Sequence, residues 1–136
     1  MSKLEIVHGN HCIHSIGLHL IWCTKYRHPV LINGVDSIVK QTIVNACLTY
    51  GWKCHAIEVM PDHVHCFIQY PPSEAANNVS RTLKSLSAIA VFYSFPKLKK
   101  QKFWGSGLWS PSCYYGSVGA ITQDAIQKYI EEQKSK

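Results

Sequence analysis

Apolar and polar residues alternate along residues 14–27, as expected for a β-strand with one buried face. That face would carry Ile16, Leu18, Leu20 and Trp22, with Ser15, Gly17, His19 and Ile21 on the other. Residues 52–60 and 63–70 also suit strands, and the Pro61–Asp62 turn between them predicts a hairpin. Residues 111–118 predict a fourth strand.

Helical spacing of apolar residues predicts three helices. The first covers 36–50 and stops at Gly51; its apolar positions are Ile38, Val39, Ile43, Ala46, Cys47 and Tyr50. A longer helix lies within 71–95 and ends before Pro96; its repeat is Val79, Leu83, Leu86, Ala90 and Tyr93. The last helix lies within 123–133, with Thr122 as its N-cap. Residues 97–107, rich in lysine, are expected to form a basic loop.

The order of these elements is β-α-β-β-α-β followed by one extra helix. This order is typical of the ferredoxin-like fold, an α+β arrangement with an antiparallel sheet and helices on one face. A length of 136 residues suits a single domain, which we place at 1–136.

Composition narrows the class of protein. Apolar residues make up 46% of the chain, and no segment approaches the roughly 20 consecutive apolar residues that span a membrane. The N-terminus lacks the pattern of a secretory signal, so we expect a cytoplasmic protein. Its six cysteines contain no Cys-x-x-Cys pair and are expected to be reduced. A net charge of +6 favours a polyanionic partner.

Two histidines, His63 and His65, lie two residues apart on the third predicted strand. Side chains at this spacing share one face of a strand, so both could bind one metal ion. The motif is short, and the alternative is a histidine pair on the less buried face of the sheet. Asp62 has the wrong parity for this cluster and is expected to shape the turn.

Tyr129 and Gln133 lie one turn apart on the last predicted helix and would be neighbours on its surface. A tyrosine hydroxyl can attack a phosphodiester if its proton is removed or a cation stabilises the phenolate. Alternatively, Tyr129 only packs the helix against the sheet.

The lysine-rich segment combines charges with aromatic rings. Lys97, Lys99, Lys100 and Lys102 could neutralise phosphates, while a base could stack on Trp104. This combination suits single-stranded nucleic acid. The alternative is a solvated loop in which Phe103 and Trp104 close the edge of the core.

Four stretches, "LHLIWCTKYRHPVL", "MPDHVHCFI", "LWSPSCYYGSVG" and "AIQKYIEEQ", occur in this order along nearly the whole chain. Together they resemble the HUH single-tyrosine transposases of the smallest insertion sequences, the IS200-like transposases. HUH denotes histidine, a bulky hydrophobic residue and histidine, here His63, Val64 and His65.

The resemblance implies a DNA strand transferase that acts on single strands. Tyr129 would be the nucleophile and would form a 5′-phosphotyrosine; His63, His65 and Gln133 would hold Mg²⁺ or Mn²⁺. It also implies a homodimer that binds DNA hairpins at the ends of an insertion sequence, with each active site shared between subunits.

Three alternatives stay open at this point. One is a non-catalytic module of ferredoxin-like fold that binds single-stranded nucleic acid. Another is a zinc hydrolase that uses His63, His65 and a third histidine such as His19. The last is a host-adopted relative with the same chemistry and a different DNA substrate.

Overall fold

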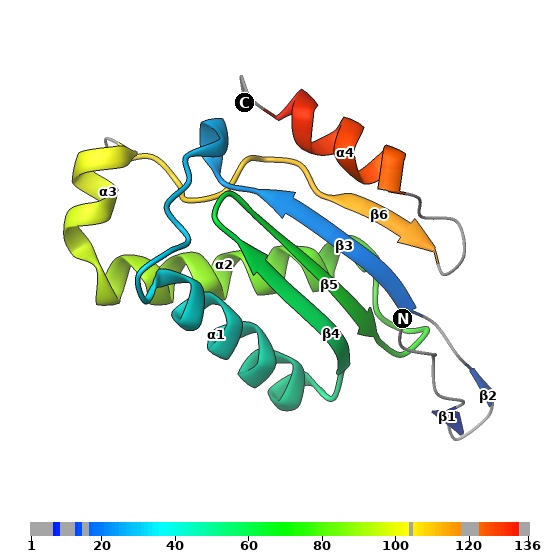
Figure 1. Cartoon of the computed structure of the whole chain (residues 1–136). Helices are drawn as coiled ribbons and strands as arrows, with labels where there is room; N and C mark the ends of the chain where they lie inside the picture. The colour runs from blue at the N-terminus through cyan, green and yellow to red at the C-terminus, as the bar shows by residue number, and fades with distance from the viewer. Residues whose placement is uncertain (1–6, 9–12, 15–16, 104, 118–122, 134–136) are drawn as a thin grey trace.

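The computed structural model describes residues 7–8, 13–14, 17–103, 105–117 and 123–133. Its main elements are β3 (Gly17–Cys23), α1 (Val35–Tyr50), β4 (Lys53–Met60), β5 (His63–Gln69), α2 (Ala76–Ser94) and β6 (Tyr114–Ser117). A C-terminal helix, α4 (Gln123–Glu132), follows (Figure 1). The predicted β-α-β-β-α-β order with one extra helix is confirmed.

The four strands form one antiparallel sheet in the order β4-β5-β3-β6. The predicted hairpin is present, since β5 pairs with β4 across the turn at residues 61–62. On its other side β5 pairs with β3, which places His63 opposite Cys23 and His65 opposite Ile21. The α+β, ferredoxin-like fold class is therefore confirmed.

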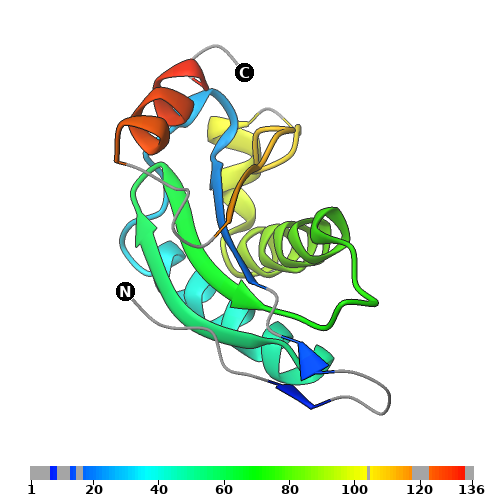
Figure 2. The ribbon, with the colours of Figure 1, turned by 90° about the vertical axis from the view of Figure 1, so that its right-hand side faces the viewer.

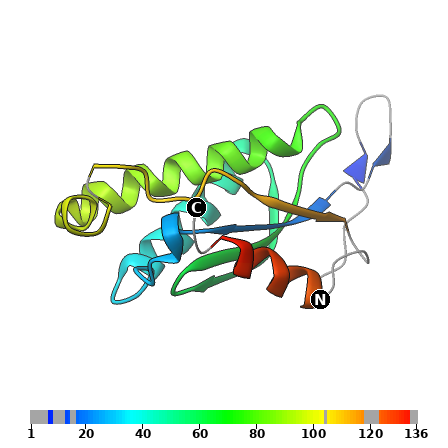
Figure 3. The ribbon, with the colours of Figure 1, turned by 90° about the horizontal axis from the view of Figure 1, so that it is seen from above.

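Helices cover both faces of this sheet. The main core lies between the sheet and the pair α1 and α2; fully buried members include Leu20, Trp22, Val39, Ile43, Val64, Ile68, Val79 and Leu83. On the opposite face, Ile21 and Cys23 of β3 form a smaller cluster with Tyr129 and Ile130 of α4. Figure 3 shows β6 between α2 and α4, with α4 on the far side of the sheet from α2.

The expected basic loop is wrong in part, because its first half is a helix, α3 (Pro96–Lys102). Proline fits the first turn of a helix, where its missing N–H would have no partner, so Pro96 both follows α2 and begins α3. Leu98 and Phe103 pack against the main core. The four lysines remain exposed, as expected, whereas Trp104 lies outside the described residues.

The predicted buried face of the long helix is also partly wrong. Val79 and Leu83 are buried, but Leu86 is 36% exposed and Tyr93 is 87% exposed. The buried stripe continues instead through Ser87 and Val91, at a strict spacing of four residues. Ser87 is tolerated there because its hydroxyl donates to the Leu83 carbonyl and accepts from the Trp109 indole.

The remaining differences lie at the ends of elements. Helix α1 stops at Gly51, whose φ of 74° is the left-handed C-cap that glycine favours, but Tyr50 is 53% exposed. Strand β6 is shorter than the predicted 111–118, and the expected cap Thr122 lies outside the described residues.

A two-stranded pair that the sequence did not predict, β1 (Val7–His8) with β2 (Ile13–His14), lies apart from the four-stranded sheet at the end away from α3 (Figures 1 and 2). Among the described helices, none is long and apolar enough to cross a membrane.

Candidate active site

The two histidines share one face of β5, as the spacing predicted. Val64 and Cys66 point into the main core and are fully buried, so His63 and His65 point to the opposite face. Their partners on β3, Cys23 and Ile21, belong to the cluster that α4 covers. The strand therefore presents both imidazoles on the face of the sheet that carries the tyrosine helix.

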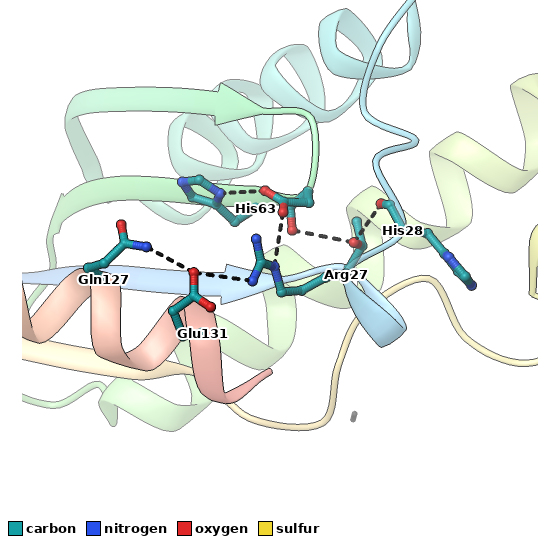
Figure 4. A network of polar contacts seen from close by, with 7 residues as sticks. Arg27, His28, His63, Gln127 and Glu131 are labelled. Atoms are coloured by element: carbon teal, nitrogen blue, oxygen red, sulfur yellow. Dashed lines mark hydrogen bonds and ion pairs between the residues drawn. The ribbon is translucent and has the colours of Figure 1, made fainter. Parts of the chain in front are cut away.

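His63 is fixed by an ionised carboxylate and an arginine. Its Nδ1 lies 2.8 Å from Oδ1 of Asp62, and Oδ2 of Asp62 accepts from Nε of Arg27 at 3.0 Å (Figure 4). Burial raises the pKa of Asp62, but the hydrogen bonds and charges of His63 and Arg27 outweigh it and hold that pKa below its ordinary value. Asp62 therefore does more than shape the turn.

This arrangement determines which nitrogen of His63 is free. An ionised carboxylate can only accept, so Nδ1 of His63 carries the proton and donates to Asp62. In the neutral ring, the lone pair is then on Nε2. A histidine oriented in this way by a carboxylate is the usual form of a histidine that binds a metal ion.

The segment that carries Arg27 is held against the hairpin turn. The Thr24 N–H donates to the Asp62 carbonyl at 3.0 Å, and the Leu31 N–H donates to the Pro61 carbonyl at 2.9 Å. Tyr26 and Arg27 both adopt positive φ, 57° and 54°, a conformation that costs a non-glycine residue roughly 1–2 kcal/mol. This strain accompanies the conformation in which Arg27 reaches Asp62.

His65 has a different partner. Its Nε2 lies 3.0 Å from Nδ1 of His19, and burial lowers the pKa of both rings. One neutral ring must donate to the other, so this contact occupies Nε2 of His65. His19 also stacks on Phe67, with ring centres 4.6 Å apart.

Helix α4 turns Tyr129 toward β3, β6 and the segment 110–113, and Gln133, the residue directly after the helix, points to the same segment. The Tyr129 hydroxyl lies 3.1 Å from Oγ of Ser112, and its ring meets that of Tyr114 edge-on at 5.7 Å. Oε1 of Gln133 accepts from Ser110 at 2.9 Å and from Ser112 at 3.1 Å. Ser112 thus holds both side chains.

Both side chains are buried in this position, Tyr129 at 8% exposure and Gln133 at 3%. Burial raises the pKa of the Tyr129 hydroxyl, although the hydrogen bond with Ser112 opposes the shift. Within the described residues, no hydrogen bond joins Tyr129 or Gln133 to either histidine. The structure therefore brings the predicted residues to the same face of the sheet without bringing them together.

A different side of α4 faces the histidines. Residues two apart on a helix point about 200° apart around its axis, so Glu131 faces away from the Tyr129 side. Glu131 lies 3.8 Å from Nη1 of Arg27 and accepts from Gln127 at 3.0 Å (Figure 4). Through Arg27, α4 is linked to Asp62 and His63.

The donor set agrees with a metal site only in part. Nε2 of His63 is free and oriented, whereas Nε2 of His65 and Oε1 of Gln133 are occupied by other partners. Across the described ranges, no three His, Cys, Asp or Glu side chains are grouped to hold an ion. For the zinc alternative, His19 and His65 would have to give up the contact between Nδ1 of His19 and Nε2 of His65 to bind one ion through these atoms.

Sequence reasoning missed Arg27, Ser110 and Ser112 as parts of the site. All three fall inside the stretches quoted for the family resemblance, "CTKYRHPVL" and "LWSPSCYY", which was the available signal. Their roles depend on contacts between distant residues, such as Arg27 with Asp62, which spacing alone does not reveal.

Residues 12–133 match the family described as "Transposase IS200 like". The chain belongs to the IS200-like transposase family. The family resemblance drawn from the sequence is thereby confirmed, and this membership makes the protein a DNA-cleaving and rejoining enzyme by class.

Individual IS200-like transposases are similar along most of their length. The ISDra2 transposase TnpA of Deinococcus radiodurans is 39% identical over 98% of this chain and 94% of its own. The IS200 transposase of Salmonella typhimurium is 25% identical over 85% of this chain and 78% of its own.

Two solved structures have the same fold. A crystal structure of a transposase from Deinococcus radiodurans superposes with a TM-score of 0.87 at 37% identity, covering 96% of this chain and 99% of that one. A REP-associated tyrosine transposase bound to a REP hairpin has a TM-score of 0.55 at 13% identity, covering 85% and 62%. The second similarity concerns the fold alone.

Proposed function

We propose that this transposase cleaves and rejoins single-stranded DNA at the ends of its insertion sequence through a 5′-phosphotyrosine on Tyr129. The observation that supports this most is the Asp62–His63 pair, because a carboxylate-oriented imidazole is suited to bind a metal ion beside a scissile phosphate. Family membership supports strand cleavage; the choice of tyrosine and ligands is our proposal.

In the proposed reaction, the Tyr129 oxygen forms a bond to phosphorus while the bond from phosphorus to the 3′-oxygen breaks. The tyrosine proton passes to a base, and the leaving 3′-oxygen takes up a proton to become a hydroxyl. One phosphodiester replaces another, so rejoining needs no external energy source. Mg²⁺ or Mn²⁺, held by His63, His65 and Gln133, would polarise the phosphate oxygens.

This reaction requires α4 to leave the position seen here. Tyr129 is buried against Ser112 with its pKa raised, which favours the neutral and less nucleophilic phenol. Gln133 must exchange its two serine donors for the ion. His65 must turn Nε2, or its other ring nitrogen, toward the ion. The structure therefore corresponds to a resting arrangement in this proposal.

The non-catalytic alternative, a single-stranded nucleic-acid-binding module, shares the fold but needs neither the oriented His63 nor a tyrosine hydroxyl. Adduct formation separates the two. Labelled single-stranded DNA from the candidate element ends is incubated with Mn²⁺, and covalent protein–DNA adducts are scored on denaturing gels.

Wild type should form adducts and Tyr129→Phe should form none. Tyr114→Phe is the matched control, since it removes a hydroxyl from the ring that contacts Tyr129 and should keep the adduct. His63→Ala, or chelation of the ion, should also abolish it. Adducts that persist in Tyr129→Phe would assign the chemistry to another residue.

We further propose a homodimer with shared sites and hairpin DNA as its ligand. The REP-associated tyrosine transposase of the same fold was solved bound to a hairpin, and α4 here docks on its own chain's sheet. Mixing His63→Ala and Tyr129→Phe subunits tests sharing. If sites are shared, the mixed dimer regains one complete site, and the adduct appears only on the His63→Ala chain. Confirmed mixed dimers without adduct would exclude shared sites.

A further inference from the structure

A polar cavity of about 370 Å³ opens between α2 and the edge strand β6, on the side of the sheet away from Tyr129. Its polar lining comes from Asn77, Ser80, Arg81, Lys84, Ser85 and Tyr115. Two of these side chains are cations, and none is a carboxylate. Figure 3 shows α2 running alongside β6 at this edge.

Lys84 brings a positive charge into this cavity without an acidic partner. Its Nζ donates to the carbonyls of Ser110 at 2.8 Å and Ser112 at 3.1 Å. Burial lowers the pKa of Lys84, the usual result when an ammonium loses water. No carboxylate in the described part of the chain forms an ion pair with it, and one of its three N–H groups has no partner in these two bonds.

Arg81 supplies a second cation at the rim of the cavity. Nη2 of its exposed side chain donates to Oδ1 of Asn77 at 3.2 Å, which leaves other guanidinium donors for a ligand. The hydroxyls of Ser80 and Tyr115 are already paired. Ser80 donates to the Asn77 carbonyl at 3.0 Å, so Tyr115 is the donor in the 2.7 Å contact between Tyr115 and Ser80.

We propose that this α2–β6 cavity binds one phosphate of the DNA backbone, an inference that rests on the proposed action on DNA. Arginine matches the two non-bridging oxygens of a phosphodiester, and a lysine adds a point charge. A volume of about 370 Å³ admits a phosphate with parts of its flanking sugars. Such a contact positions the strand and does not read its sequence.

A short chain of hydrogen bonds connects the cavity to Tyr129, the proposed nucleophile. Lys84 holds the backbone of Ser110 and Ser112, and the hydroxyls of these serines hold Gln133 and Tyr129. A DNA strand bound here lies on the face of the sheet that α1 and α2 cover. It passes around the β6 edge to reach the face that α4 covers. This site is separate from the lysines of α3.

The test measures binding, not cleavage, so it is independent of the tyrosine chemistry. Binding of fluorescent oligothymidylate and of a DNA hairpin is followed by anisotropy over a range of salt concentrations. Each phosphate contact contributes about 0.7 to the slope of log K against log salt for single strands and about 0.9 for duplex DNA. Arg81→Gln should weaken binding and reduce the slope by about this amount.

Arg81→Lys, which keeps the charge, should restore most of the slope. Lys40→Gln is the matched control, because Lys40 is an exposed cation on α1 away from the cavity. Lys84→Met should weaken binding further; because it also loosens the 110–112 segment, its fold is checked by circular dichroism and the decision rests on Arg81.

A free phosphate site is distinguished by titrating inorganic phosphate at constant ionic strength and following the amide resonances around Arg81 and Lys84. Weak perturbation that DNA displaces supports the proposal. Tight binding of inorganic phosphate together with an unchanged DNA slope in Arg81→Gln would overturn it. If the slope is unchanged in Arg81→Gln while wild type still forms the Tyr129 adduct, the cavity is excluded as a DNA-binding site and the proposed function is unaffected.

Discussion

The histidine half and the tyrosine half of the site differ in how they are held. His63 lies at the start of a strand whose other face is fully buried, and Asp62 and Arg27 fix its ring. Tyr129 and Gln133 are held by two serine hydroxyls and a small apolar cluster. The histidine half is organised for the proposed metal binding, whereas the tyrosine half is kept away from the histidines by contacts that can be exchanged.

This difference suggests how cleavage can be restricted to the correct DNA. A transposase that kept a reactive tyrosine beside a bound ion would risk cutting any single strand. In this structure the phenol is buried with a raised pKa, and Oε1 of Gln133, the proposed metal ligand, accepts hydrogen bonds from two serines. The cost of releasing α4 can then be offset by binding free energy from the correct substrate.

The largest effect is expected from Asp62→Asn. Asparagine can no longer act as the charged acceptor that fixes the tautomer of His63, so the affinity for Mn²⁺ should fall by about 10–100-fold. Titration calorimetry measures it, with Asp36→Asn on α1 as the control. Unchanged affinity in Asp62→Asn would show that the histidine half does not depend on this carboxylate.

A smaller effect is expected when the tyrosine half is loosened. Replacing Ser110 and Ser112 with alanine leaves the buried Gln133 carbonyl without a donor, at a cost of about 1–3 kcal/mol. Amides of α4 should then exchange with deuterium about tenfold faster than in wild type, while β5 is unaffected. Ser94→Ala, at the exposed end of α2, is the control. Equal protection of α4 in both variants would contradict the docking role of these serines.

The α3 lysines should influence DNA binding without affecting either half of the site. Lys99→Ala with Lys100→Ala should reduce the salt slope by about 1.4–1.8 if both contact phosphates. The rate of adduct formation at saturating DNA should stay the same. A slope equal to that of wild type would show that α3 is not part of the DNA-binding surface.

The smallest effect concerns the acid stability of the histidine half. The pKa of Asp62 is lower in the folded chain than the ordinary value of about 3.9 expected on unfolding. Its contribution is therefore present above about pH 4 and is lost as the pH falls through the folded pKa. As the pH is lowered through this range, the melting temperature of wild type should fall more steeply than that of Asp62→Asn. Parallel curves would show that the Asp62 interactions add no stability.

The fold could be predicted from the sequence because local patterns agree with it. The alternation along β5 placed both histidines on one face of the strand and Val64 on the other. Gly51 marked the end of α1. The pattern misled where a polar residue is buried, as at Ser87, or where Pro96 both follows one helix and starts the next.

Sequence patterns nominate the residues of the candidate site one by one, and their roles stay predictions. His63 and His65 followed from strand parity, and Tyr129 and Gln133 from helix spacing together with the family resemblance. The contacts of Arg27 with Asp62 and of Ser112 with Tyr129 join residues far apart in sequence, so no local pattern contains them. The docked position of α4 depends on tertiary packing and could not be read from spacing.

The separation of the two halves, and their joining on DNA, can be measured with a fluorine probe. 4-Fluorophenylalanine at position 129 puts fluorine in place of the hydroxyl, so no adduct forms, and Mn²⁺ bound at the histidines broadens any nearby fluorine resonance. The same substitution at position 114 is the control. We expect Mn²⁺ alone to broaden the two resonances to a similar degree, and single-stranded DNA from the element ends to broaden the one at 129 far more strongly. Selective broadening at 129 before DNA is added, or none after it, would contradict a tyrosine helix that docks apart and joins the histidines on DNA.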